Sequence, residues 1–303
     1  MSNDLTNRPT NGGPTLEQVL RWIPTPGFQR HLRTQLTAQL ERKINMTTAT
    51  IPEGFRTLTP YLLVKDVDRM LEFYTKVFGA ETMSRDETPR GGLHSMFRIG
   101  DSALMMGGPA EGSTTQLHYY LDETKDSLED VVQRAVDAGA TSVFDILTAD
   151  YGERFGVVRD PAGNHWILAE RGTSKIVLPE MGTLTSYLHP DNAAEFIEFM
   201  ENAFGAEELM RADVPGRGIA HAKMRVGTSV LEFGEGNPLG LTTPTMFYVY
   251  VADVGKAYQQ GLDAGAESVQ APAETPYGDY TAAFKDRWGN QWYVAEHRAP
   301  EKA

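Results

Sequence analysis

The chain has no cysteine among its 303 residues. This excludes disulfide bonds, thiolate metal ligands and cysteine nucleophiles, and it fits a reducing compartment. The chain also lacks a run of ~18 consecutive apolar residues, the minimum for a membrane-spanning helix. We therefore expect a cytoplasmic protein without a membrane partner.

Positive charge is scarce as well. The chain carries 28 Lys and Arg against 41 Asp and Glu, a net charge of −13. Proteins that bind nucleic acid usually show a basic patch, so we expect no nucleic-acid partner. The sequence also lacks a phosphate-binding glycine loop, a dinucleotide fingerprint and a Ser-His-Asp arrangement. Its 41% hydrophobic content nevertheless suffices for packed cores.

What the chain does contain is a duplication. Residues 151–170 read as two short strands around Asp160-Pro161-Ala162-Gly163, a sequence that suits a type I turn. Residues 277–296 repeat this hairpin at an offset of 126, with Tyr-Gly, Asp, Gly-Asn, Trp and Ala-Glu in register. A period this long indicates two whole domains rather than an array of short repeats.

The same offset relates segments upstream of the hairpin. Residues 57–62 match residues 183–188, and both copies continue into a Phe-Gly-Ala-Glu segment. We therefore place one domain at residues 55–173 and a second at residues 178–298.

Residues 1–50 precede the repeat and differ from it. They carry six Lys or Arg and three Asp or Glu, a charge of +3 that leaves −16 on the remainder. The first part is polar and predicts disorder. Phe28, Leu32, Leu36 and Leu40 then recur every four residues, which predicts a short helix that docks on the folded protein or on a partner. A transit peptide is a less favoured alternative.

Each domain should contain two modules of one strand, one helix and three strands. In the first module, residues 57–64 read as a strand, and Asp66 and Gly79 bound a helix as its N-cap and its C-terminal glycine. Gly100-Asp101 then joins two further strands as a two-residue hairpin turn. The pattern restarts near Leu117, so we expect an α+β fold with four modules in the chain.

These motifs resemble the vicinal oxygen chelate superfamily, which includes glyoxalase I, bleomycin-resistance proteins and extradiol dioxygenases. The resemblance rests on the order of elements, on the Phe-Tyr-x-x-Val-Phe-Gly-Ala segment that ends at Ala80, and on the hairpin at residues 151–170. Within the superfamily, the PhnB-like, glyoxalase-like branch is the most similar. The resemblance implies the fold and a small-molecule ligand, but members include both enzymes and pure binding proteins.

The resemblance also implies where a divalent metal would bind. Metal-dependent members use His, Gln or Glu from the first and last strands of each module. The matching positions in this chain hold Thr59, Thr185, Met105, Glu232, Leu117 (with His118 adjacent), Phe247, Ile167 and Tyr293. Only Glu232 is a suitable ligand. We therefore expect no cofactor and a lost metal site, with a bound divalent metal as the alternative.

Period-2 alternation predicts which side chains share the open face of each sheet. The turn at Gly100-Asp101 pairs Met96 with Met105 and His94 with Gly107, and the repeat pairs Lys223 with Glu232. The candidate ligand-binding residues are Tyr61, His94, Met96, Met105, His165, Ile167, Tyr187, His221, Lys223, Arg225, Glu232 and Tyr293. Alternation sends Trp166 and Trp292 to the opposite face, into the core, whereas His118 has no defined face.

Some of these residues also have a purely structural interpretation. His94 and His221 are candidate general bases because an unperturbed imidazole titrates near pH 6.5, but they also fit as hydrogen-bonded wall residues. Lys223 and Glu232 fit a cross-strand salt bridge better than an acid–base couple. Glu153 and Arg154 could bind an anionic ligand, but an exposed ion pair on a loop is the favoured expectation.

Three classes of function remain open. The favoured one is a small-molecule binding protein whose cavities are lined by aromatic, Met and His side chains. The second is a lyase, isomerase or dioxygenase, and the third is an interaction protein that uses its N-terminal helix.

The duplication further predicts an internal pseudo-dimer, with a homo-oligomer also open. We expect the first domain to combine His94 and His165 in an apolar cavity. The second should hold a more charged cavity around Lys223 and Glu232.

Overall fold

The computed structural model describes residues 28–88, 91–110, 114–122, 125–149, 152–171, 177–178, 180–216, 218–236, 244–275 and 278–298. These residues form two eight-stranded sheets. Sheet A has the strand order β14 (Glu267–Glu274), β15 (Tyr280–Lys285), β16 (Gln291–Glu296), β13 (Met246–Tyr250), β1 (Leu58–Leu63), β4 (Ser102–Gly108), β3 (Leu93–Ile99), β2 (Glu81–Glu87). Sheet B has the strand order β10 (Glu207–Val214), β11 (Gly218–Val226), β12 (Ser229–Phe233), β9 (Leu184–Leu188), β5 (Gln116–Leu121), β8 (His165–Glu170), β7 (Arg154–Arg159), β6 (Thr141–Thr148).

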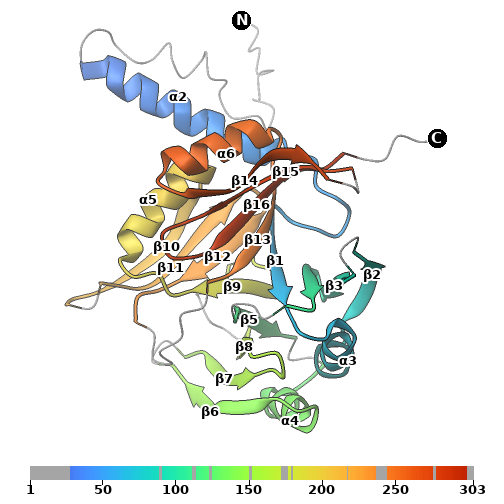
Figure 1. Cartoon of the computed structure of the whole chain (residues 1–303). Coiled ribbons are helices and arrows are strands. Elements are labelled where there is room, and N and C mark those ends of the chain that lie inside the picture. The colour runs from blue at the N-terminus through green and yellow to red at the C-terminus, as the bar shows by residue number, and fades with distance from the viewer. Residues whose placement is uncertain are drawn as a thin grey trace, which may run out of the picture.

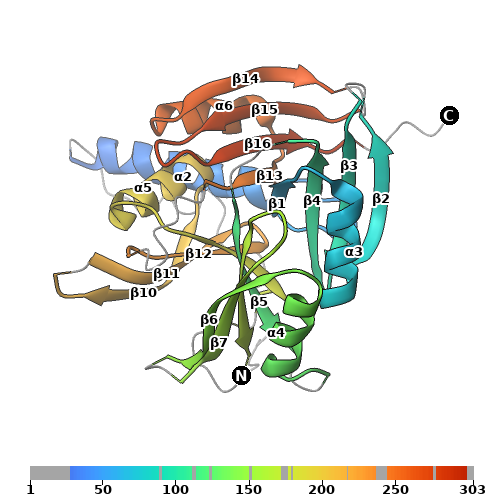
Figure 2. The ribbon, with the colours of Figure 1, turned by 60° about the horizontal axis from the view of Figure 1, so that its bottom comes forward.

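Both sheets are shared between the two halves of the chain. In sheet A, β1 pairs in parallel with β4 of its own module and antiparallel with β13 of the last module. Sheet B joins the second and third modules in the same way through β5 and β9. Figure 2 shows the strands of the first and last modules meeting at β1. The open face of each sheet therefore draws its side chains from both sequence repeats.

Each half nevertheless keeps its own helical core. Helices α3 (Val67–Phe78) and α4 (Leu128–Asp137) pack together over the first half, and α5 (Ala193–Phe204) and α6 (Val254–Asp263) do so over the second. The two helix pairs lie on opposite sides of the molecule (Figure 1). In the part of the chain that the structure describes, no helix lies on the opposite face of either sheet, which we call the helix-free face.

Local sequence explains the helix ends. Asp66 accepts a hydrogen bond from the Arg69 backbone N–H at 3.1 Å, and Gly79 ends α3 with a φ of 66°. Both predicted caps of this helix are confirmed. The left-handed conformation at the helix end favours glycine because it carries no Cβ.

The repeated hairpin motif is built around one aspartate in each copy. Asp160 Oδ1 accepts hydrogen bonds from the backbone N–H groups of Ala162 and Asn164, both at 2.9 Å. Its Oδ2 accepts from the indole N–H of Trp166 at 3.0 Å. Asp286 holds Trp292 in the same way at 2.9 Å. The motif thus fixes a tight turn and orients a tryptophan into each core, where both tryptophans are fully buried as predicted.

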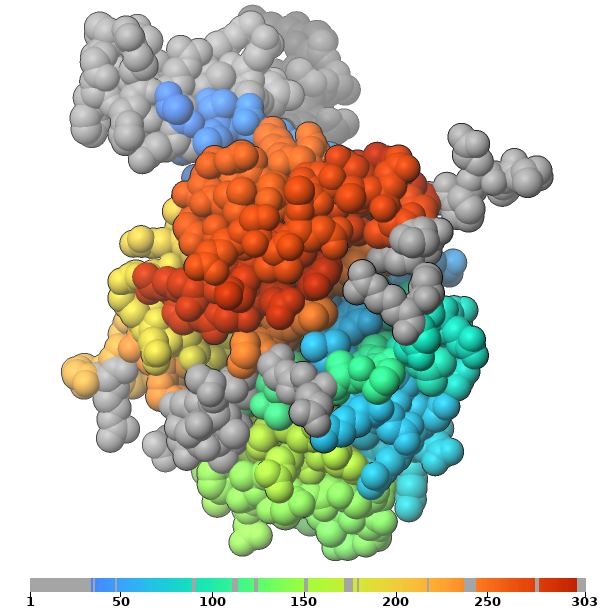
Figure 3. All heavy atoms as spheres, viewed as in Figure 1, coloured from blue at the N-terminus to red at the C-terminus, as the bar shows by residue number. Residues whose placement is uncertain are grey.

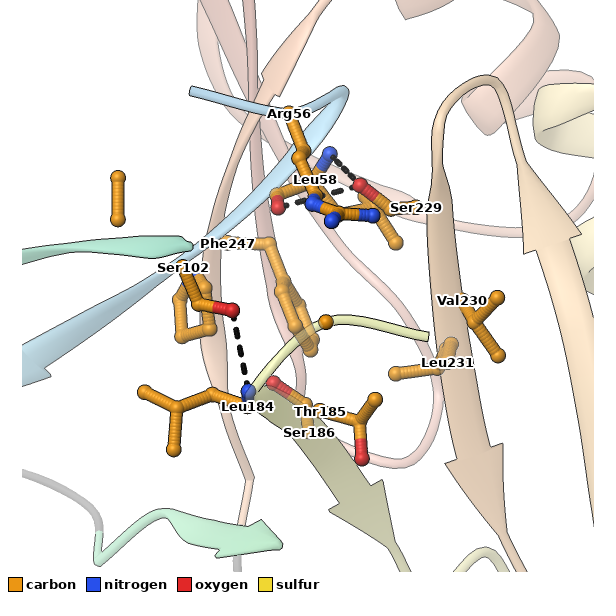
Figure 4. Close-up of a pocket in the computed structure, with 13 residues that line it drawn as sticks. Arg56, Leu58, Ser102, Leu184, Thr185, Ser186, Ser229, Val230, Leu231 and Phe247 are labelled. Atoms are coloured by element: carbon orange, nitrogen blue, oxygen red, sulfur yellow. Dashed lines mark hydrogen bonds between the residues drawn. The ribbon is translucent and has the colours of Figure 1, made fainter. Parts of the chain in front are cut away.

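Hydrogen bonds with twofold-like symmetry join the halves between the sheets. Ser229 Oγ accepts a hydrogen bond from the Leu58 backbone N–H at 2.8 Å, and Ser102 Oγ accepts from that of Leu184 at 3.0 Å. Figure 4 shows these contacts around a small cavity of about 40 Å³. The cavity is too small for an organic ligand, because ligand sites usually measure several hundred Å³.

The N-terminal helix α2 (Phe28–Thr47) is longer than expected and docks differently. The side chains of Phe28 and Leu32 lie outside the described set, and Leu36 is 36% exposed, so its predicted role in docking is wrong. Docking instead involves Met46, which enters the core of the second half, and Asn45, which binds the backbone of Asp253. In the space-filling view α2 lies on the outside of the molecule (Figure 3). Among the described residues, no helix is long and apolar enough to cross a membrane.

Candidate functional site

The helix-free face of sheet B carries a buried charged network around Glu232 on β12. Glu232 and Lys223 are both 0% exposed, and Lys223 Nζ lies 2.8 Å from Glu232 Oε2. His221 Nε2 lies 3.0 Å from the same oxygen. Oε1 accepts hydrogen bonds from the hydroxyls of Tyr120, at 2.9 Å, and Thr185. Four donors from three neighbouring strands, β11, β9 and β5, therefore surround one carboxylate.

This network keeps Glu232 ionised. Burial alone favours the neutral acid, but His118, His221 and Lys223 outweigh it and hold the pKa of Glu232 well below its ordinary value. An ionised carboxylate can only accept hydrogen bonds, so every contact to Glu232 must come from a donor. The predicted pairing of Lys223 with Glu232 is confirmed as a buried cross-strand salt bridge.

A second acidic residue, Glu153, lies next to this network. It is 4% exposed, and its Oε1 is 3.7 Å from His118 Nε2. Burial raises the pKa of Glu153, so this carboxyl holds its proton more readily than a solvated one. The expected exposed Glu153–Arg154 pair is wrong. Arg154 instead binds Glu129 and Glu170, and Glu153 faces inward.

One half of this face remains open. Tyr187, His189, His221 and Ile167 are each only partly buried there. The ring of Tyr187 packs against those of His189 and His221, at centroid distances of 5.1 and 5.5 Å. We call these four residues the open half of sheet B. Aromatic and imidazole rings therefore border the charged network on its exposed side.

The other half is covered by the segment that leads into β9. Met181 is 2% exposed and lies against Tyr120 and Val230, with its sulfur 3.3 Å from Lys223 Nζ. Val177 packs in the same cluster. This contact shields Lys223, which is 0% exposed although it lies on the helix-free face.

The helix-free face of sheet A has the same plan but a different chemistry. Met105, Tyr248 and Tyr250 form a buried apolar cluster, with Tyr61, Met96 and Tyr293 packed against it. The ring of His94 packs against that of Tyr61 at a tilt of 35°, with 5.6 Å between the ring centroids. Burial lowers the pKa of His94, which favours its neutral form. The predicted pairs Met96–Met105 and His94–Gly107 are confirmed.

An equivalent segment covers part of sheet A. Phe55 lies 6.0 Å from the ring of Tyr250, and Ile51 joins the same cluster. Ile51 and Phe55 occupy the positions of Val177 and Met181 at the repeat offset of 126. The segment that leads into the first strand of each repeat therefore covers half of one helix-free face. We call it the approach segment; it contains Ile51 and Phe55 in the first repeat, and Val177 and Met181 in the second.

The predicted grouping of the cavities is wrong, because the sheets are shared. His94 lies in sheet A, whereas His165 and Ile167 lie in sheet B with Lys223 and Glu232. His165 is 5% exposed and lies beside Gln116 of β5, away from the Glu232 network. Tyr293 belongs to sheet A, whereas the prediction placed it in the second-domain cavity with Lys223 and Glu232. Arg225 lies at the rim, where Glu180 and Glu207 bind it.

The family model of the Glyoxalase/Bleomycin resistance protein/Dioxygenase superfamily matches residues 54–168 and 187–294. The chain belongs to this superfamily. The match spans both repeats, so both halves of the duplication are superfamily domains.

Individual relatives add little about activity. An uncharacterized protein of Mycobacterium bovis is 34% identical over 126 residues, covering 37% of this chain and 82% of the relative. An uncharacterized protein of Mycobacterium tuberculosis shows the same identity over the same length and is covered to 73%.

Solved structures of the superfamily support the fold. Glyoxalase I from Zea mays aligns with a TM-score of 0.61 at 17% identity, covering 79% of this chain and 92% of that one. A putative dioxygenase from Bacillus subtilis aligns with a TM-score of 0.53 at 14% identity, covering 78% and 83%. At these identities the likeness concerns the fold.

Superfamily members can carry a divalent metal on the helix-free face, and the side chains of this chain fit one poorly. In sheet B the equivalent positions hold Thr185, Glu232, His118 and Ile167, and in sheet A they hold Thr59, Met105, Tyr248 and Tyr293. Both oxygens of Glu232 are engaged by donors, including the Lys223 ammonium. Among the described residues, no group of three or more His, Asp or Glu is arranged to hold a metal ion.

Sequence reasoning did not place four residues in this network: His118, Tyr120, Glu153 and Thr185. The alternation of His118 with Tyr120 on β5 was available as a signal. It could not be used because β5 is not joined to a neighbour by a tight turn, which left its face undefined. The sequence indicates Thr185 only as a possible metal ligand, whereas its hydroxyl donates a hydrogen bond to Glu232.

Proposed function

We propose that this chain is a metal-independent small-molecule binding protein of the superfamily, and that its principal ligand lies on the open half of sheet B. The proposal rests above all on the charged network under Tyr187 and His221. Burying Lys223 and Glu232 is expensive in desolvation, and well-packed apolar residues would stabilise a sheet as well or better. Such networks cluster at functional sites, which favours a ligand role.

The chemistry of the face supports a polar, partly aromatic ligand. Rings of Tyr187 and His221 offer stacking surfaces, and the imidazoles offer hydrogen bonds. Lys223 supplies a fixed positive charge where a metal-dependent relative would hold a cation, and Glu232 neutralises it. Because the Lys223–Glu232 pair has no net charge, the site does not require a charged ligand.

The face of sheet A is the candidate for a second, more apolar ligand. Met105, Tyr248 and Tyr250 are buried, and the partly exposed residues beside them are Tyr61 and His94. We propose that the two faces have diverged and bind different chemical classes. The hairpin motif around Asp160 supports placing the chain in the PhnB-like branch.

Two matched variants test this proposal. His221→Ala should weaken binding of polar ligands to sheet B, and His94→Ala should weaken apolar aromatic ligands on sheet A. Mass spectrometry of small molecules that survive purification supplies the first ligand, and calorimetric titration of one panel against both variants gives the affinities. Equal losses for every ligand in both variants would contradict divergence. Binding unaffected by either variant would contradict both sites.

One observation favours an enzyme as the second candidate. His221 donates from Nε2 to the ionised Glu232, which orients the ring and leaves Nδ1 of the neutral imidazole as an acceptor. A histidine oriented by a carboxylate in this way can act as a general base. Deuterium uptake from D₂O into a bound ligand, lost in His221→Ala, would favour a proton-transferring isomerase or lyase over a binding protein.

A further inference from the structure

Hydrogen bonding around Tyr120 fixes the tautomer of His118. The Tyr120 hydroxyl has one hydrogen, and it donates this hydrogen to Glu232 Oε1 at 2.9 Å. The contact of 3.2 Å between Tyr120 Oη and His118 Nδ1 must then be donated by the imidazole. In the neutral ring the hydrogen therefore lies on Nδ1, and Nε2 carries a lone pair.

That lone pair has no hydrogen-bond partner among the described residues. His118 is 4% exposed, and its Nε2 is buried without a hydrogen bond. Glu153 is equally buried, and its Oε2 also lacks a partner. Nε2 and Glu153 Oε1 are 3.7 Å apart, too far for a direct hydrogen bond. Two buried polar atoms left unpaired on neighbouring groups destabilise the fold unless something bridges them.

The other repeat shows which group can hydrogen-bond to an acidic side chain at the position of Glu153. Asp279 of sheet A stands where Glu153 stands in sheet B, at the offset of 126. Tyr248 occupies the strand position of His118, and its phenolic hydroxyl donates to Asp279 Oδ2 at 2.8 Å. Sheet A thus supplies from its own side chain a hydroxyl that sheet B lacks.

We propose that His118 Nε2 and the carboxyl group of Glu153 together bind one hydroxyl group of the ligand. The hydroxyl donates to Nε2 and accepts from the protonated carboxyl, a pair of roles that an ether, a methyl group or a carboxylate cannot fill. Burial raises the pKa of Glu153, which favours the donor form. This inference rests on the proposed ligand site in sheet B and names its ligand class as hydroxyl-bearing.

The surroundings fit the remainder of such a ligand. His118 pairs across the sheet with half-buried Ile167 on β8, and its ring lies 6.4 Å from that of Tyr187. Both neighbours belong to the open half of sheet B, so a ring attached to the hydroxyl would contact apolar surface. The hydrogen-bond chain then runs from Glu153 through the ligand to His118, Tyr120 and Glu232.

The test compares p-cresol with p-xylene, in which a methyl group replaces the hydroxyl at similar size. Calorimetry or ligand-observed NMR on the full chain should show p-cresol binding about tenfold tighter, the effect of one net hydrogen bond. Glu153→Met and His118→Phe should each abolish this preference, so that each variant binds the two probes with equal affinity. Asp279→Asn is the matched control in sheet A and should keep the preference.

The outcomes separate this inference from the proposed function. If both probes bind the unmodified chain equally, and His221→Ala weakens both, the hydroxyl subsite is overturned but the ligand site in sheet B is supported. A water molecule would then bridge His118 and Glu153. A preference that survives in both variants would also overturn the inference. Failure of both probes to bind would reject the hydroxyl-bearing aromatic class, whereas the proposed function is judged separately on the ligand that co-purifies. Thermal melts of each variant confirm that it is folded.

Discussion

Lys223 Nζ lies 2.8 Å from Glu232 Oε2, and neither side chain is exposed to solvent. The pair lies on the helix-free face of sheet B, where Met181 of the approach segment shields it. Because a buried charge is tolerable only with its partner present, removing one partner is more harmful than removing both.

Glu232→Gln should therefore lower the free energy of unfolding by about 3–5 kcal/mol, since it leaves the Lys223 ammonium buried opposite a neutral amide. The double variant Lys223→Met with Glu232→Gln should recover most of this loss. Urea unfolding followed by circular dichroism measures both. As a control, Glu81→Gln breaks the exposed pair with Arg98 and should have little effect. A double variant less stable than Glu232→Gln would contradict this account.

The same ammonium should keep divalent metals out of sheet B. Lys223→Ala frees Glu232 Oε2 beside His221, which lies 3.0 Å from it, so the variant should bind Co²⁺ at least about tenfold tighter than the unmodified chain. Visible absorption of bound Co²⁺ provides the measurement, and a further His221→Ala change should remove the gain. Stoichiometric Co²⁺ binding by the unmodified chain, lost in Glu232→Gln, would show that the metal site persists.

Predictions that depend on local pattern were reliable. The duplication and the hairpin turn at Gly100-Asp101 were sufficient to pair His94 with Gly107, and the repeat transferred this register to Lys223 and Glu232. Alternation within a strand placed Trp166 in the core. These features involve neighbours in sequence, where turn geometry and side-chain period decide the outcome.

Features that depend on distant pairing were not accessible. The contact between β1 and β13 joins the ends of the repeat, and nothing in either strand specifies that partner. The grouping of His94 with His165 failed for this reason. Glu153 was assigned to the surface because a charged residue on a loop is usually exposed, and only the fold reveals that it faces His118.

Histidines that are partly or fully buried should make the fold sensitive to acid. Burial lowers the pKa of His94, His165 and His189, so the unfolded chain binds more protons than the folded one below about pH 6.5. Stability should consequently fall as pH decreases from about 7 to 5, by at most about 1.4 kcal/mol per pH unit for each proton difference. Glu153, whose pKa is raised, opposes this trend by favouring the folded state at lower pH. Thermal melts across this range should show a shallower decline for His189→Asn, and an identical slope would contradict the assignment.

Docking of α2 should depend on its C-terminal end. Met46 is 3% exposed in the core of the second half, so Met46→Ser should destabilise the chain by about 2–4 kcal/mol and expose α2 to protease. Leu36 is 36% exposed, and Leu36→Ser should change stability by less than about 0.5 kcal/mol. Limited proteolysis with mass mapping of residues 28–47 distinguishes the two variants. Equal digestion of both would mean that Met46 does not anchor the helix.

Residues 55–173 expressed alone should dimerise. This fragment keeps the core formed by α3 and α4, but it loses β13 beside β1 and β9 beside β5. Both missing contacts are antiparallel, and β5 is the repeat equivalent of β13, so β1 of one copy can pair with β5 of another and rebuild two eight-stranded sheets. Unpaired central strands would otherwise leave backbone groups exposed along an apolar edge. Light scattering after size exclusion should give the mass of a dimer, and adding residues 178–298 should convert it to a heterodimer. A stable, compact monomer of the fragment would show that each half folds without a shared sheet.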